Sequence, residues 1–126
     1  MIRQTWRHNS LKESFMGAFK GVIIIFKNER YVKIVCFYGV SIILLAIILN
    51  ASLIEIAVLV ITITVVLVAE IFNAVVENIM DIVKPYKDHH IKILKETSAG
   101  MVLISSFGAA IVGGVIFLPK IIAIFK

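Results

Sequence analysis

The amino-acid sequence predicts an all-α membrane protein that forms one domain over residues 1–126, with an N-terminal amphipathic surface helix and three transmembrane helices. The first observation is composition, because 60% of the 126 residues are hydrophobic, whereas soluble domains are about 45–50% apolar. The second is the presence of long apolar runs, close to the roughly 20 residues that a helix needs to cross a bilayer. A chain of this length cannot cover so much apolar surface with polar residues. We therefore expect lipid around it.

Residues 1–33 are expected to form the surface helix. Its apolar stripe consists of residues spaced by four, three and four positions: Phe15, Phe19, Val22 and Phe26. Such a stripe on a basic helix is typical of helices that lie in the membrane interface, where Trp6 would be a further anchor. If the helix continues, Glu29 lies within about 40° of the stripe and points toward the bilayer and the other helices. The alternative is that Glu29 pairs with Arg30 or Lys33.

The three membrane helices are expected at about residues 34–50, 53–83 and 99–125. The third is expected to continue past Pro119. Small residues recur every four positions along it, at Ser105, Ala109 and Gly113. Rows of small residues let helices approach closely, so this face is expected to pack against another helix.

Basic residues indicate the orientation in the membrane. They precede the first apolar run and fill the segment between the second and third: Arg3, Arg7, Lys12, Lys20, Lys27, Arg30 and Lys33, then Lys84, Lys87, Lys92 and Lys95. The connection at residues 50–52 has no Lys or Arg, so the positive-inside rule puts the N-terminus and the Lys84–Lys95 segment in the cytoplasm. These charges, with no aromatic platform among them, favour anionic lipid headgroups over nucleic acid.

Several other residues carry weaker signals. The single Cys36 excludes an intramolecular disulfide and a cysteine zinc cluster. The adjacent His89 and His90 would point about 100° apart on a helix and are expected as solvated loop residues. Tyr86 would either stack on a base or lie at the membrane interface. The chain has no G-x-x-x-x-G-K-[ST] phosphate loop, so any nucleotide would be bound by another arrangement.

The most informative segment is a polar stripe late in the second membrane helix. Steps of three, four and four residues separate its members, which therefore share one helix face: Glu70, Asn73, Glu77 and Asp81. A carboxylate at membrane depth is energetically costly, so it indicates a functional site. Three helices alone cannot enclose this stripe, which predicts a homo-oligomer.

The stripe and the neighbouring basic residues suit phosphoryl transfer to a lipid. This reaction requires a divalent metal, a cation that offsets phosphate charge and a group that deprotonates or orients the nucleophile. Magnesium favours one or two carboxylates besides the phosphate oxygens, and Glu77 with Glu29 would supply them. Lys95 would meet the phosphates, and Glu70, deepest in the membrane, would accept a proton from a lipid hydroxyl. An ion conduit would instead distribute its carboxylates through the depth of the bilayer.

The pattern E-x-x-N-x-x-x-E-x-x-x-D from Glu70 to Asp81 resembles the signature of small prokaryotic membrane kinases, the diacylglycerol kinase and undecaprenol kinase family. Upstream, the motif S-F-x-x-A-x-x-G that ends at Gly21 resembles the N-terminal segment of the Gram-positive branch. Downstream, Lys95 and Glu96 stand where the family has Lys-Asp. The resemblance therefore covers nearly the whole chain.

Three positions depart from the family pattern. Ala74 stands where Ser or Thr is usual, so a hydroxyl is missing, and Glu96 is one methylene longer than Asp. Val35 stands where a second carboxylate is often seen. These differences bear on substrate choice and rate more than on the type of reaction.

The resemblance implies a homotrimer in a bacterial plasma membrane, with ATP as co-substrate and Mg2+ as cofactor. It implies Glu70 as the catalytic base and Glu29 and Glu77 as the metal ligands. The residues implied to help bind the nucleotide and its phosphates are Gly21, Asn73, Asp81, Lys95 and Glu96. The Gram-positive character of the N-terminal segment favours undecaprenol as the lipid, with diacylglycerol as the alternative. A non-catalytic oligomeric membrane protein or an ion conduit is the other class of function.

Overall fold

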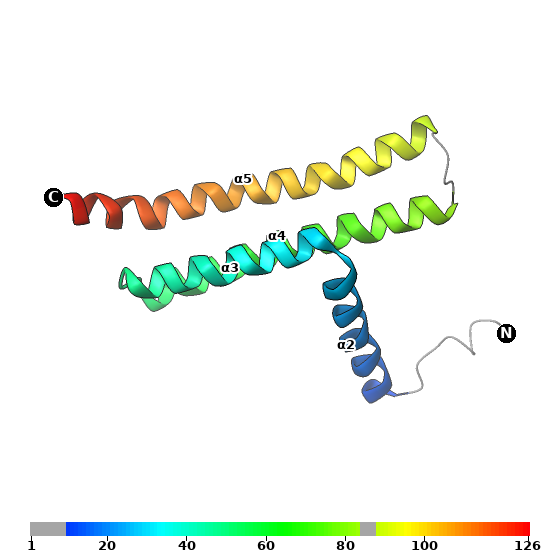
Figure 1. Ribbon diagram of the computed structural model, residues 1–126, viewed down its shortest axis with the longest axis horizontal. Helices are drawn as coiled ribbons and strands as arrows, with labels where there is room; N and C mark the ends of the chain where they lie inside the picture. The colour runs from blue at the N-terminus through cyan, green and yellow to red at the C-terminus, as the bar shows by residue number, and fades with distance from the viewer. Residues whose placement is uncertain (1–9, 84–87) are drawn as a thin grey trace. The chain divides into compact units, whose positions relative to one another are not determined.

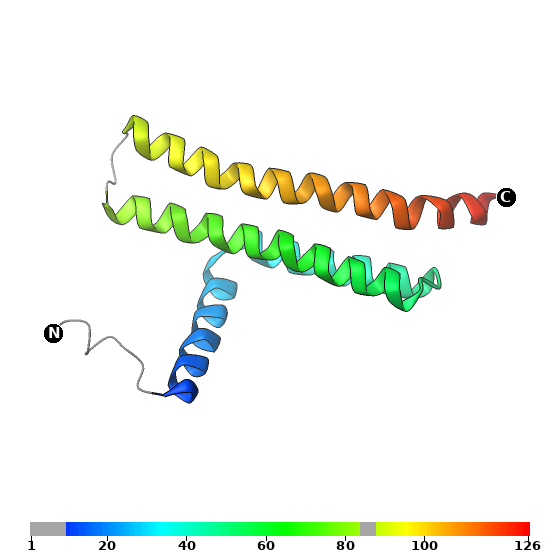
Figure 2. The same ribbon diagram turned by 180° about the vertical axis from the view of Figure 1, so that it is seen from behind.

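The computed structural model describes residues 10–83 and 88–126, and Figures 1 and 2 show it from opposite sides. Within these ranges the regular secondary structure consists of α2 (Leu11–Asn28), α3 (Arg30–Ile48), α4 (Leu53–Val83) and α5 (His89–Phe125). The last three are long and apolar enough to cross a membrane. The predicted class of all-α membrane protein is therefore confirmed. The chain divides into two compact units, residues 1–30 and 31–126.

Some residues used in the sequence predictions lie outside the described ranges: Arg3, Trp6, Arg7, Lys84, Tyr86 and Lys87. Their assigned functions as interface anchor, topology signals and base-stacking group stay predictions.

α2 is the helix of the first unit, and it ends earlier than predicted. Its N-cap is Ser10, whose Oγ accepts a hydrogen bond from the Glu13 N–H at 3.2 Å and so satisfies one free amide of the helix start. The helix ends at Glu29, whose backbone is extended (φ −104°, ψ 115°) while its N–H donates to the Ile25 carbonyl. The expected continuous helix over residues 1–33 is thus interrupted. The helical step does not apply to an extended residue, so the direction predicted for the Glu29 side chain stays a prediction.

α3 ends in a tight turn built by local hydrogen bonds. Asn50 has a left-handed backbone with φ of 58°, and its N–H donates to the Ile47 carbonyl at 3.1 Å. The Ala51 N–H donates to the Ala46 carbonyl at 2.9 Å. This pair of bonds is the Schellman motif, in which Asn sometimes replaces Gly. The motif ends α3 at a defined point, from which the chain reverses into α4.

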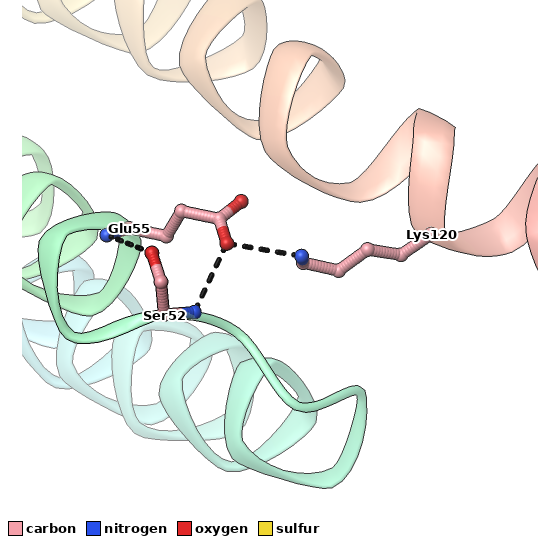
Figure 3. A network of polar contacts seen from close by, with 3 residues as sticks. All are labelled: Ser52, Glu55 and Lys120. Carbon is pink, nitrogen blue, oxygen red and sulfur yellow. Dashed lines mark hydrogen bonds and ion pairs between the residues drawn. The ribbon is translucent and has the colours of Figure 1, made fainter.

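α4 begins with a capping box that also binds the far end of α5 (Figure 3). The Ser52 Oγ accepts from the Glu55 N–H at 3.1 Å, and Glu55 Oε1 accepts from the Ser52 N–H at 3.0 Å, which is the reciprocal pattern of an S-x-x-E box. The same Glu55 Oε1 lies 3.0 Å from Lys120 Nζ. Lys120 lies in the last turns of α5, directly after Pro119. The ion pair therefore joins this end of α5 to the first turn of α4.

The three helices α3, α4 and α5 pack through a small apolar cluster, and α3 and α4 also meet at a close glycine contact. A buried cluster takes one residue from each helix: Ala46, Leu59 and Ile116. α3 approaches α4 closely at Gly39, where a Cβ would lie 2.7 Å from Cγ2 of Ile63, too close for two carbon atoms. Gly39 therefore sets the distance between these two helices. α4 and α5 run antiparallel and side by side, as both views show (Figures 1 and 2).

α4 and α5 are longer than a bilayer requires. They have 31 and 37 residues, which correspond to about 46 and 56 Å at about 1.5 Å per residue, against roughly 30 Å of hydrocarbon. α5 continues through Pro119 to Phe125, as expected. It starts at His89, however, and not near residue 99, so His89 and His90 are exposed helical residues and the predicted loop is wrong. Asp88 explains the early start, because its Oδ1 caps the helix by accepting from the His90 N–H at 2.9 Å.

Much of the apolar surface of the second unit is not covered within one chain. On α5, for example, Leu103, Ile104 and Phe107 are 72%, 76% and 69% exposed. Apolar surface this extensive indicates contact with lipid or with other protein chains.

Candidate functional site

α4 carries the predicted polar stripe without interruption, so helical geometry puts its four side chains on one face. Glu70 and Asn73 are half-buried, whereas Glu77 and Asp81 are exposed. The stripe extends about 16 Å along the helix axis from Glu70 to Asp81 at about 1.5 Å per residue. A stripe of this length can contact both a membrane-embedded hydroxyl and a phosphate-bearing molecule outside the hydrocarbon.

α4 is long enough for the stripe to lie at one boundary of the membrane when the helix enters the hydrocarbon at Leu53. About 20 residues counted from Leu53 cross the hydrocarbon and end close to Glu70 and Asn73. Glu77 and Asp81 then lie beyond the hydrocarbon, where headgroups and water solvate a carboxylate. Of the three carboxylates in the stripe, Glu70 bears the largest part of the cost of a carboxylate at membrane depth.

Two predicted site residues are in direct contact across α4 and α5. Lys95 Nζ lies 2.7 Å from Asp81 Oδ1. The Asp81 side chain is 62% exposed and the Lys95 side chain 37%, and ion pairs this exposed contribute only about 0–1 kcal/mol. The pair therefore holds Lys95 beside the stripe weakly enough for a phosphate group to compete for it.

A second contact between the same helices involves a residue that sequence reasoning missed. The Ser98 hydroxyl donates to Asn73 Oδ1 at 2.8 Å and lies 3.0 Å from the Lys95 carbonyl oxygen. Ser98 is only 3% exposed. Its position one turn after Lys95 was the available signal, because residues three apart share a helix face. The membrane helix predicted from about residue 99 does not include Ser98.

Glu96 lies on another side of α5. Its carboxylate is 3.9 Å from Lys92 Nζ, and the two side chains are 66% and 72% exposed. Adjacent residues on a helix point about 100° apart, so Glu96 does not share the face on which Lys95 meets Asp81. The nucleotide-binding role implied for Glu96 stays a prediction.

Gly21 and Glu29 belong to the first compact unit. Gly21 is exposed on α2, and a Cβ there would meet no atom within 4 Å among the described residues. Glu29 occupies the extended residue between α2 and α3, so the direction of its carboxylate is not dictated by either helix. The roles implied for Gly21 in nucleotide binding and for Glu29 in metal binding stay predictions.

The carboxylates of the stripe suit magnesium, although they do not form a complete metal cage. Among residues 10–83 and 88–126, no three His, Cys, Asp or Glu side chains gather in a way that could hold a metal ion. Magnesium commonly takes one or two carboxylates and completes its shell with water and phosphate oxygens. Glu77 is exposed on α4 one turn from Asp81, and is therefore an accessible carboxylate of the kind this ion uses.

Comparison with known proteins points to the same part of the chain. Residues 16–117 match the sequence model of the family described as prokaryotic diacylglycerol kinase, and this range contains every predicted site residue from Gly21 to Glu96. A diacylglycerol kinase of Synechocystis sp. is 34% identical over 116 residues, which cover 91% of this chain and 66% of that relative. The chain thus spans slightly less than two thirds of the length of the relative.

Proposed function

This chain belongs to the prokaryotic diacylglycerol kinase family, and we propose that it is a lipid kinase that transfers the γ-phosphate of ATP to the hydroxyl of a membrane lipid. The observation that carries this proposal is the 2.7 Å contact between Lys95 and Asp81. Because of this contact, a cation suited to phosphate lies beside the exposed end of the stripe. Glu70, at the other end, lies close to the membrane boundary, where a lipid hydroxyl is found.

Each residue of the stripe has a proposed role in this reaction. Glu70 accepts the proton of the lipid hydroxyl as the hydroxyl oxygen attacks the γ-phosphorus. Lys95 exchanges Asp81 for the phosphate oxygens and offsets their negative charge. Glu77, together with Glu29, would hold Mg2+, which when bound neutralises phosphate oxygens. The remaining contacts to the nucleotide are proposed for Gly21, Asn73, Asp81 and Glu96.

We further propose that the site and the N-terminus face the cytoplasm of a bacterial cell, where ATP is available. Basic residues support this orientation: Lys92 and Lys95 lie at the start of α5, near the stripe, whereas the turn at residues 50–52, at the opposite end of α4, has no Lys or Arg. A homotrimer is proposed because the exposed apolar surface of α5 needs partners and because one chain leaves the stripe open on one side.

Diacylglycerol and undecaprenol are the two candidate lipids. The names of both the matching family and the Synechocystis relative refer to diacylglycerol, so we place this lipid first. The resemblance of the N-terminal segment to the Gram-positive branch favours undecaprenol, and that prediction remains. The two lipids differ mainly in chains that contact interchangeable apolar residues, so the choice requires a direct comparison.

The test is transfer of labelled γ-phosphate from ATP by the purified chain in mixed micelles, with each lipid offered in parallel and with or without magnesium. Magnesium-dependent label on one lipid supports the kinase and identifies the acceptor. Absence of label on both lipids, from a folded oligomer, contradicts the proposal and favours a non-catalytic membrane protein.

Glu70→Gln tests the proposed base within the same assay. It should abolish turnover while leaving oligomerisation and ATP binding intact, because glutamine keeps the shape of the side chain and cannot accept the proton. Glu55→Gln is the matched control, since it changes the same group at the opposite end of α4 and should leave turnover unchanged. Normal turnover of Glu70→Gln excludes the role proposed for Glu70.

A further inference from the structure

We propose that Ser98 is a positioning residue that fixes the side-chain amide of Asn73 for nucleotide binding, an inference that rests on the proposed kinase function. The two side chains come from different helices, and the Ser98 Oγ lies 2.8 Å from Asn73 Oδ1. Ser98 is 3% exposed, so it cannot touch a nucleotide in solution and acts through Asn73. Asn73 itself is half-buried and keeps an accessible side.

The contact with Asn73 is not needed to bury the Ser98 hydroxyl. The Lys95 carbonyl, one turn earlier on α5, already offers an acceptor at 3.0 Å. Ser105, two turns further along, shows this local solution, because its hydroxyl donates to the Val102 carbonyl at 3.0 Å. A serine can thus be satisfied within its own helix. The hydrogen bond to Asn73 is therefore not required to satisfy Ser98. Its effect is to constrain the side chain of Asn73.

The hydrogen bond gives the two ends of the Asn73 amide different tasks. Oδ1 accepts from Ser98, so the Nδ2 group, with two donor hydrogens, is directed away from Ser98 and can donate to a phosphate or nucleoside oxygen. Without the Ser98 hydroxyl, rotation of the amide by 180° would present an acceptor in place of these donors. Ala74, the next residue on α4, is 6% exposed and has no hydroxyl that could replace the Ser98 hydroxyl.

The experiment compares Ser98→Ala with the unmodified chain in mixed micelles, by equilibrium binding of ATP and by steady-state phosphorylation of the lipid that the unmodified chain accepts. Loss of one positioning hydrogen bond corresponds to a factor of about five in affinity. We therefore expect the Kd and KM for ATP to rise about fivefold, with kcat within about twofold and KM for the lipid unchanged. Ser98→Thr keeps the hydroxyl and should restore ATP affinity.

Ser105→Ala is the matched control, because it removes a hydroxyl that bonds only its own helix among the described residues. It should leave ATP affinity unchanged. Equal effects of the two alanine variants, or unchanged ATP affinity in Ser98→Ala, overturn the inference. A lower melting temperature of Ser98→Ala with unchanged ATP affinity overturns it as well, because it reduces Ser98 to helix packing. ATP binding without phosphate transfer by the unmodified chain refutes the kinase proposal alone, and the Kd comparison then still decides the role of Ser98.

Discussion

Replacing Gly39 by alanine should weaken the packing of α3 against α4. The added Cβ would lie 2.7 Å from Cγ2 of Ile63, and a β-branched side chain in a helix has little rotamer freedom with which to move away. Overpacking of this kind costs about 1–3 kcal/mol. Alanine is also the better helix former by about 1 kcal/mol. The free energy of unfolding should therefore fall by about 0–2 kcal/mol, the difference between the two effects.

Gly108 provides a control that removes the helix-propensity contribution. It lies inside α5, and a Cβ there would meet no atom within 4 Å in the described part of the chain. Gly108→Ala therefore gains the same propensity without the clash. The difference in free energy of unfolding between the two variants is then the steric cost itself, about 1–3 kcal/mol.

The free energy of unfolding of both variants can be measured by titrating SDS into mild detergent micelles. Several protein concentrations should be used, so that any effect of Gly108 on association appears as a concentration dependence. Ile63→Ala removes the opposing methyl group, so Gly39→Ala should cost less in that background. Equal stability of Gly39→Ala and Gly108→Ala would refute the conclusion that Gly39 sets the distance between α3 and α4.

Three further substitutions test other parts of the structure. Lys120→Met keeps the apolar stem but removes the cation from Glu55, and it should lower the thermal midpoint in detergent without changing lipid phosphorylation. Salt should then lower the midpoint of the variant less than that of the unmodified chain, because no ion pair is left to screen. Asn50→Ala should lower the free energy of unfolding by about 1–2 kcal/mol, the cost of a left-handed backbone for alanine, whereas Asn50→Gly should not, and the same SDS titration compares them. Lys95→Met should raise KM for ATP by about tenfold or more, because a hydrogen bond from a charged donor is lost. The thermal midpoint of Lys95→Met should hardly change, since the exposed pair with Asp81 contributes little to stability. A large fall in that midpoint would contradict the conclusion that the pair is weak.

Sequence alone was sufficient for the features that depend on local periodicity. The apolar runs predicted the class of all-α membrane protein, because hydropathy over about 20 residues does not depend on which helix packs against which. The spacing of Glu70, Asn73, Glu77 and Asp81 predicted one shared face, because any continuous α-helix repeats every 3.6 residues. The helix ends were predicted less well. α5 starts at His89, after its N-cap Asp88, and α2 stops at Asn28, before the extended Glu29. At both ends the local capping geometry overrides the apolar pattern.

Only the tertiary structure decided which residues of different helices meet. The contacts of Lys95 with Asp81, of Ser98 with Asn73 and of Lys120 with Glu55 depend on the register of α5 along α4. That register follows from the length and ends of the two helices and from their packing, as where Leu59 of α4 and Ile116 of α5 share a buried cluster. Helical periodicity gives the direction of a side chain around its own axis, but it carries no information about the neighbour at the same height. The contact that holds Asn73 therefore became visible only once α4 and α5 lay side by side.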